Sequence, residues 1–192
     1  MKVVEYYFSP VSPWTYLGHA RFADLARRLG ATIKAKPVDY GVIFPVSGGL
    51  PLGKRAPQRQ AYRLVELARW RDRLGLPLTL QPKFFPVDGL QGALLIAGAA
   101  EEKRMALAGD VLAGVWMREE NIADPGVLSA IAARNGIADI GPVLEAGKAN
   151  FAAYTQEALA RNVFGAPTYS YAGELFWGQD RLDFLERSLA RT

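Results

Sequence analysis

Residues 9–16 (SPVSPWTY) join a stretch typical of a β-strand to one typical of a helix. Pro13 has a fixed φ that suits the first helical position, which makes Ser12 the expected N-cap residue. Backbone N–H groups and the positive end of the helix dipole converge there. They favour an anion by about 0.3–1 kcal/mol at an exposed site and up to about 2 kcal/mol at a partly buried one. A thiolate is such an anion, whereas the plainer interpretation is that Ser12 only caps the helix.

Two further segments carry candidate binding groups. Residues 164–168 (FGAPT) place Pro167 just before a strand, where a cis bond after Ala166 would expose the backbone of Ala166 to a ligand. The alternative is an ordinary strand-entry proline. Gln179 and Asp180 open the last helix and are candidates for binding the amino and carboxylate ends of a small peptide, although Asp180 with Asp183 also resembles a simple helix cap.

The absence of cysteine limits the chemistry. Among the 192 residues there is no Cys, which excludes disulfides, thiolate metal sites and a cysteine nucleophile. Any thiol must therefore be brought in from outside. His19 is the single histidine, so we expect no metal site and interpret His19 as a core or surface residue.

Composition also restricts the partners. The net charge is +4, with Lys and Arg dispersed among carboxylates, a modest bias that favours small anionic substrates. No dense basic tract or RNA-binding aromatic motif is present, so we expect no nucleic-acid partner. The longest apolar run, residues 93–100, is far below the roughly 18 residues of a membrane span, and the N-terminus does not resemble a signal peptide. We therefore expect no membrane partner and a cytoplasmic location.

The first 40 residues predict a βαβ unit. Residues 2–8 are typical of a strand, residues 13–29 carry apolar side chains at helical spacing before Gly30, and residues 31–38 are typical of a second strand. The two strands should lie parallel because a helix connects them.

The middle of the chain predicts a helical block. Residues 41–57 are punctuated by Gly and Pro and are expected to form a loop. Helices are then expected over residues 58–74, 90–121 with a break near Gly109, 124–134, and 141–162 with a possible break at Gly147.

The last part of the chain predicts a hairpin of two short strands, residues 168–171 and 175–177, followed by a helix over 180–190. The complete order predicts an α/β, thioredoxin-like fold with a large all-helical insertion between the second strand and a C-terminal α-β-β-α unit. We assign residues 1–40 and 150–192 to the thioredoxin-like domain and residues 41–149 to the insertion.

Residues 12–18, 164–168 and 175–182 together resemble the 2-hydroxychromene-2-carboxylate isomerases, which are grouped with the kappa-class glutathione transferases and the DsbA-like oxidoreductases. The resemblance implies that Ser12 donates a hydrogen bond to the sulfur of glutathione. It also implies that Ala166, beside Pro167, pairs with the cysteinyl backbone and that Gln179 and Asp180 hold the γ-glutamyl end. Stabilising the thiolate by about 1–3 kcal/mol would lower its pKa by roughly one or two units.

The activity implied by the resemblance is glutathione-dependent cis-trans isomerisation of 2-hydroxychromene-2-carboxylate, or of a similar aromatic carboxylate, by reversible thiol addition. A homodimer is also implied. The alternatives are a kappa-like glutathione transferase or peroxidase acting on an electrophile, and a non-catalytic thioredoxin-like module that binds peptides. Relatives often carry a T-G-N-x-P element where this chain has residues 47–51 (SGGLP). Lys54 or Arg55 is a candidate for a carboxylate contact in this loop, and the plainer interpretation is a solvated loop cation.

Overall fold

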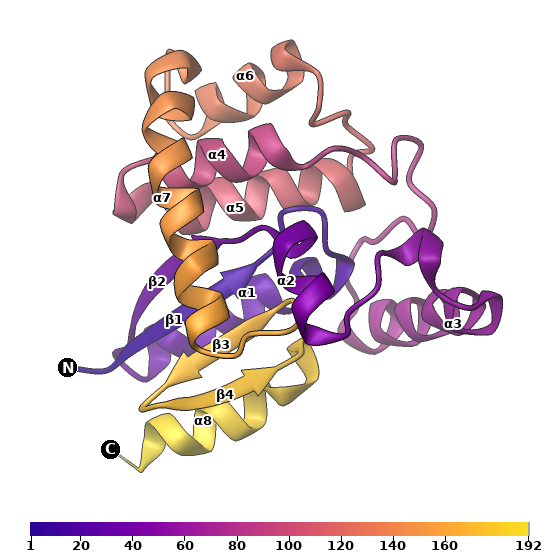
Figure 1. Ribbon diagram of the computed structural model, residues 1–192, viewed down its shortest axis with the longest axis vertical. Helices are drawn as coiled ribbons and strands as arrows, with labels where there is room; N and C mark the ends of the chain where they lie inside the picture. Colours follow the sequence, from indigo (N-terminus) through magenta and orange to yellow (C-terminus); the bar gives the residue numbers. More distant parts are fainter. Residues whose placement is uncertain (192) are drawn as a thin grey trace.

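The computed structural model describes residues 1–191, and a four-stranded sheet lies at its centre (Figure 1). The strand order is β2-β1-β3-β4. Strand β1 (Val3–Phe8) runs parallel to β2 (Thr32–Pro37), while β3 (Thr168–Tyr171) is antiparallel both to β1 and to β4 (Glu174–Trp177). The predicted βαβ unit and C-terminal hairpin are confirmed.

Helix α1 (Pro13–Arg28) connects the two parallel strands. It begins as the sequence predicts, with Ser12 as N-cap and Pro13 in the first turn. The chain leaves the helix through Gly30, whose φ of 64° lies in the left-handed region that glycine adopts readily. Leu17, Phe22 and Leu25 form its buried stripe.

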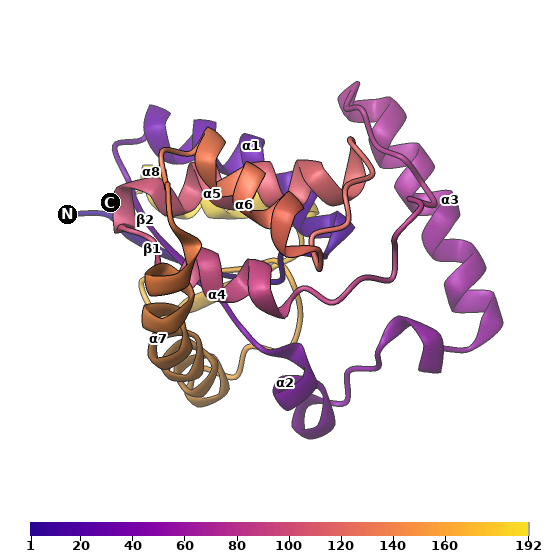
Figure 2. The same cartoon turned by 90° about the horizontal axis from the view of Figure 1, so that it is seen from above.

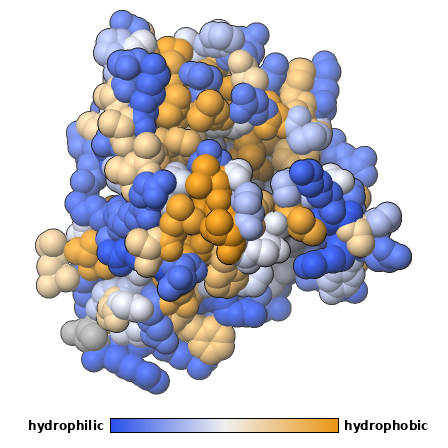
Figure 3. Space-filling view, in the orientation of Figure 1, coloured by the Kyte–Doolittle hydropathy of each residue, from blue (hydrophilic) through white to orange (hydrophobic). Residues whose placement is uncertain are grey.

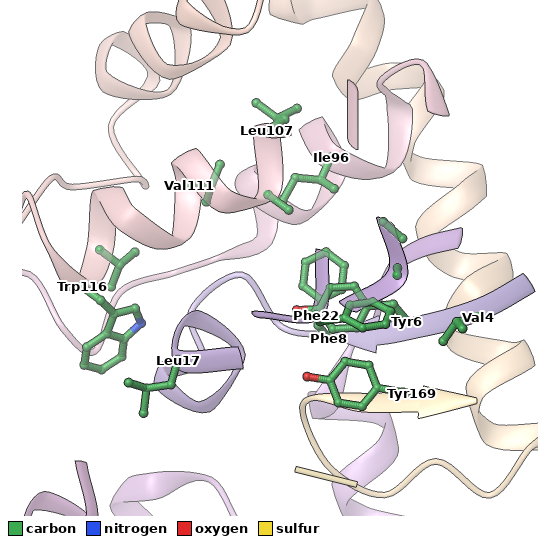
Figure 4. Packing of buried hydrophobic residues seen from close by; sticks show 14 of the residues in the cluster. Val4, Tyr6, Phe8, Leu17, Phe22, Ile96, Leu107, Val111, Trp116 and Tyr169 are labelled. Atoms are coloured by element: carbon green, nitrogen blue, oxygen red, sulfur yellow. The ribbon is translucent and has the colours of Figure 1, made fainter. Parts of the chain in front are cut away.

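Successive side chains of β1 point to opposite faces of the sheet, so they contribute to a hydrophobic cluster on each face. Tyr6 and Phe8 join α1 and α8 (Leu182–Ala190) in the larger cluster, and Figure 4 shows their rings close to Tyr169 of β3. The Tyr6 and Tyr169 rings stack with centroids 5.4 Å apart. Tyr7 faces the opposite way, into a smaller cluster with residues of α2 and α7.

The helical insertion lies between β2 and the C-terminal hairpin, so the predicted fold class is confirmed. Leu107 and Trp116 of the insertion belong to the same hydrophobic cluster as Tyr6 of the sheet. The predicted boundary at 149/150 falls within one continuous helix. The elements between β2 and β3 are α2 (Tyr40–Ser47), the short 3₁₀ helix η1 (Leu52–Lys54), α3 (Pro57–Leu74), α4 (Leu90–Gly98), α5 (Glu101–Trp116), α6 (Pro125–Arg134) and α7 (Ile140–Ala160).

The prediction of a loop over residues 41–57 is wrong in its first part, because α2 forms there. The Asp39 carboxylate accepts the Gly41 N–H at 2.7 Å and caps this helix, while Gly48, with a φ of 76°, ends it. Apolar side chains gather near the middle of the face in Figure 3, where α2 lies, and Val42 and Val46 are among the exposed ones.

The predicted helix breaks at Gly109 and Gly147 are also wrong. A Cβ on Gly109 would lie 3.2 Å from the His19 ring, and a Cβ on Gly147 would lie 2.0 Å from the Leu94 carbonyl oxygen. Both glycines lie inside continuous helices, where the Leu94 backbone leaves no room for a Cβ on Gly147 and the His19 ring leaves little room for one on Gly109. The break near Gly109 falls instead between α4 and α5, after Gly98.

Helix α3 stands beside the rest of the molecule and is reached by long segments at both ends (Figure 2). It begins at Pro57 and ends at Gly75, whose φ is 61°. This position makes α3 one wall of the site described below. In residues 1–191, none of the helices has the length and hydropathy needed to cross a bilayer.

Candidate active site

Ser12 presents a hydroxyl group at the N-terminus of α1. Its Oγ accepts the Thr15 N–H at 3.2 Å, and its own N–H donates to the Ser9 carbonyl at 3.1 Å. Within the described residues the Ser12 hydroxyl has no acceptor for its own proton. The first turn of α1 contains no acidic residue, so nothing there opposes a negative charge. The geometry therefore suits donation of one hydrogen bond to an incoming anion.

Strand pairing brings the loop after β1 and the loop before β3 to the same end of the sheet. Tyr7, near the end of β1, is opposite Thr168, the first residue of β3. The Ala166–Pro167 peptide bond is cis. Ala166 is partly exposed and lines a pocket, whereas Pro167 is buried. Ser12 and Pro167 thus lie in neighbouring loops, as the antiparallel pairing of their strands requires.

The segment that follows β4 is fixed to the same loop. The Gly178 N–H donates to the Pro167 carbonyl at 2.8 Å, and the 3₁₀ helix η2 (Gln179–Arg181) follows directly. Asp180 is exposed, with its carboxylate 2.5 Å from the Arg181 guanidinium. This hydrogen bond places Gln179 and Asp180 beside the cis-proline loop.

Gln179 is only 2% exposed, and its side-chain oxygen accepts from Arg21 at 2.7 Å. Because a guanidinium can only donate, the atom facing Arg21 must be the amide oxygen, which leaves the NH₂ group as the available donor. Arg21 therefore orients the Gln179 side chain.

A pocket of about 510 Å³ lies between α3 and the segment that carries η2. Ala166, Gln179 and Asp180 line it together with Trp14, two residues after Ser12. Ser12 itself and the exposed Lys54 are not among its lining residues. The complete lining is Trp14, Arg55, Gln58, Arg59, Tyr62, Arg63, Glu66, Trp70, Ala166, Trp177, Gly178, Gln179, Asp180 and Arg181.

The lining carries an excess of positive charge. Four arginines face two carboxylates, and both carboxylates are paired: Asp180 with Arg181, and Glu66 with Arg69 at 2.7 Å. Aromatic side chains, those of Trp14, Tyr62, Trp70 and Trp177, supply much of the remaining wall. Such a pocket is complementary to an anionic ligand with apolar or aromatic parts.

Arg59 and Arg63 are pocket residues that the sequence analysis did not identify. They lie four residues apart, one turn of α3, and Arg55 lies four residues before Arg59, ahead of the helix. The spacing is visible in the sequence, but arginines at this spacing are also common on solvated helix faces. Only the position of α3 opposite η2 shows that they face a pocket.

His19 has a structural role, which confirms the core interpretation. Its Nε2 lies 2.9 Å from the Met105 carbonyl oxygen, so Nε2 carries the proton, and Nδ1 accepts from the Tyr6 hydroxyl at 3.3 Å. Burial lowers the pKa of His19 and keeps the ring neutral. Across residues 1–191, no group of three or more His, Cys, Asp or Glu side chains is placed to hold a metal ion.

Comparisons with known proteins identify the family of this chain. Residues 3–190 match the family described as DSBA-like thioredoxin domain. The chain is 30% identical over 199 residues to a 2-hydroxychromene-2-carboxylate isomerase of Pseudomonas putida, covering 98% of this chain and 95% of the relative. A solved 2-hydroxychromene-2-carboxylate isomerase is 27% identical, with a TM-score of 0.83 and coverage of 98% and 95%.

A more distant relative carries a different name. Glutathione S-transferase kappa 1 of Caenorhabditis elegans is 26% identical over 144 residues, which covers 69% of this chain and 63% of the relative. Isomerases and a transferase are therefore both similar to this chain.

Proposed function

This chain belongs to the DSBA-like thioredoxin domain family, in which it groups with the 2-hydroxychromene-2-carboxylate isomerases, and we propose that it is a glutathione-dependent cis-trans isomerase of 2-hydroxychromene-2-carboxylate or a similar aromatic carboxylate. The observation that carries this proposal is the Ser12 hydroxyl, which has a proton to donate at a helix N-terminus beside the cis-Pro167 loop. The likeness to named isomerases supports an enzymatic role.

The residues present fit glutathione. Glutathione is a small anionic peptide with two carboxylates, and the η2 side of the pocket offers the Arg181 guanidinium, the Asp180 carboxylate and Gln179. The Asp180 carboxylate is suited to an ammonium group, and the partly exposed backbone of Ala166 is suited to a peptide group. A pocket of about 510 Å³ is within the usual size range for small-molecule sites.

Bound glutathione would supply a thiol that adds reversibly to the activated carbon of the substrate and is released unchanged after a bond has rotated. Ser12 would donate a hydrogen bond from its hydroxyl group to the sulfur and so favour the thiolate, assisted by the α1 dipole. Trp14 and the aromatic side chains of α3 would hold the substrate ring and limit the access of water.

Turnover of 2-hydroxychromene-2-carboxylate with product analysis tests this proposal. We expect the trans-o-hydroxybenzylidenepyruvate isomer to form while the glutathione concentration stays constant. The Ser12→Ala variant should still bind glutathione but lose most turnover. Unchanged turnover in Ser12→Ala would reject the role of Ser12.

The similarity to a kappa-class transferase supports a second candidate, conjugation of glutathione to an electrophile. The same thiol site would serve both reactions, and the acceptor alone would differ. Stoichiometric loss of free glutathione, with a conjugate detected by mass spectrometry, would favour transfer over isomerisation.

A further inference from the structure

Arg63 stands out among the pocket arginines because it is partly buried and, within the residues that the structure describes, has no acidic partner. Arg55 donates to the Leu50 carbonyl at 2.8 Å, and Arg181 pairs with Asp180. Arg59 is exposed to solvent, which can hydrate its guanidinium. Within residues 1–191, Arg63 makes neither a hydrogen bond nor an ion pair, although its side chain is partly withdrawn from water.

Two aromatic rings hold the Arg63 guanidinium in place. Its central carbon lies 5.3 Å from the Phe85 ring centroid and 5.6 Å from the Trp116 ring centroid, and the centroids of these two rings lie 4.7 Å apart. Trp116 is completely buried and belongs to the core cluster drawn in Figure 4, so packing holds its ring in place. Stacking on aromatic faces positions the guanidinium while leaving its N–H donors unused.

The electrostatic environment of Arg63 is unfavourable without an anion. Burial, and to a smaller extent the positive charge of Arg55, lowers the pKa of Arg63 to about 10, which leaves the side chain charged at neutral pH. The nearby acid of α3, Glu66, is paired with Arg69. A bound carboxylate would offset the desolvation and the repulsion together, and it matches the fork of guanidinium donors.

Arg63 lies on a different wall of the pocket from the groups proposed to hold glutathione. Gln179 and Asp180 lie on the η2 wall of the pocket, next to the cis-Pro167 loop. Arg63 lies on the α3 wall, against Phe85 and Trp116 of the insertion. Tyr62 and Trp70 of the same wall provide aromatic surface beside it.

We propose that the Arg63 guanidinium binds the carboxylate of the aromatic substrate and so selects acids over their neutral analogues. This inference rests on the proposed function, because it assigns the second substrate of the same site. Arg63 acts as a specificity-determining residue, and the thiol chemistry takes place at Ser12, which is outside the lining of the pocket.

The test measures binding without glutathione. The probes are trans-benzylidenepyruvate, an aromatic conjugated acid, and its methyl ester, which lacks the charge. Binding is followed by quenching of tryptophan fluorescence, since three tryptophans line the pocket. We expect Arg63→Gln to weaken acid binding by about 10- to 100-fold while changing ester binding by less than about twofold. Arg63→Lys should recover part of the loss, because it restores the charge without the planar fork.

Arg71→Gln is the matched control. It removes one positive charge from the same helix, where Arg71 pairs with Asp72 and does not line the pocket, and it should leave acid binding unchanged. Equal weakening of acid and ester in Arg63→Gln would overturn the proposal and indicate a packing role. An unchanged affinity for the acid would overturn it as well.

Calorimetry with glutathione keeps the two proposals distinguishable. We expect Arg63→Gln to bind glutathione as tightly as the unmodified protein. A loss of glutathione affinity with normal acid binding would assign Arg63 to glutathione and overturn this inference. Failure of the unmodified protein to bind glutathione would instead contradict the proposed function, while the acid and ester measurements would still decide the role of Arg63.

Discussion

A Cβ atom placed on Gly18 would lie 2.8 Å from the Cβ of Gln179 and 2.9 Å from the Tyr169 hydroxyl oxygen. Helix α1, whose N-cap is Ser12, therefore packs against the segment carrying Gln179 and Asp180 at a distance that only a residue without a side chain permits. Arg21, one turn further along α1, adds two hydrogen bonds to Gln179. The proposed thiol-binding and γ-glutamyl-binding groups are thereby fixed to each other through α1.

Gly18→Ala tests this coupling. The added methyl group must push η2 away from α1, so we expect a loss of stability of about 1–3 kcal/mol and a weaker affinity for glutathione. Thermal unfolding and calorimetry measure the two effects. Ala20→Ser is the control on the exposed side of the same helix and should change neither. Normal glutathione affinity in Gly18→Ala would show that η2 does not position the ligand.

His19 should make the free energy of unfolding depend on pH. Burial lowers the pKa of His19 below its ordinary value of 6.5, so its contribution to stability is fully present above about pH 6.5. As the pH falls below 6.5, the unfolded chain gains a proton that the folded chain resists, and this contribution is lost. We expect the free energy of unfolding to decrease by at most about 1.4 kcal/mol per pH unit from this residue.

Urea denaturation at several pH values measures this dependence, and the variant His19→Gln provides the comparison. The variant should be less stable at pH 7, and its stability should vary less between about pH 6.5 and pH 5. An identical slope in both proteins would contradict the neutral, buried state of His19.

Asp110 joins α5 to the segments on either side of α6. Its carboxylate accepts from Arg118 at 2.6 Å, from Arg134 at 3.1 Å and from Asn135 at 2.9 Å, and its side chain is 18% exposed. Burial alone would raise the pKa of Asp110, but the hydrogen bonds and positive charges of Arg134 and Arg118 outweigh it and lower the pKa. This contribution to stability is therefore present above the unfolded value of 3.8 and is lost as the pH falls through the folded value.

Asp110→Asn should lower the free energy of unfolding at pH 7 by about 1–2 kcal/mol, since hydrogen bonds to a charged group are lost. Thermal and urea unfolding are the measurements. Asp24→Asn serves as the control because the pairs of Asp24 with Arg27 and Arg28 are exposed, and we expect little change there. An equal effect of the two substitutions would contradict the assignment of Asp110 to the structural network.

Local chemistry explains which parts of the fold the sequence predicts. Ser12-Pro13 and Asp124-Pro125 each combine a cap with a fixed φ, and both helices start where predicted. The sequence does not predict the roles of Gly109 and Gly147, because glycine serves two purposes, helix termination and close packing. The positions of His19 and Leu94, which distinguish them, depend on tertiary contacts.

The candidate site shows the same limit. Ser12 and Pro167 are identifiable because cap chemistry and a proline at a strand entry leave local signals. Arg63 is not, since its meaning depends on Phe85 and Trp116, which come from two later segments of the insertion. A role set by contacts between distant segments leaves no periodic pattern in the sequence.

The titration of the bound glutathione thiol tests the central claim most directly. Thiolate formation is followed by ultraviolet absorbance across a pH series, with glutathione saturating either the unmodified protein or Ser12→Ala. Donation of one hydrogen bond by Ser12 should make the thiol pKa in the unmodified protein roughly one or two units lower than in Ser12→Ala. The same thiol pKa in both proteins would contradict the account.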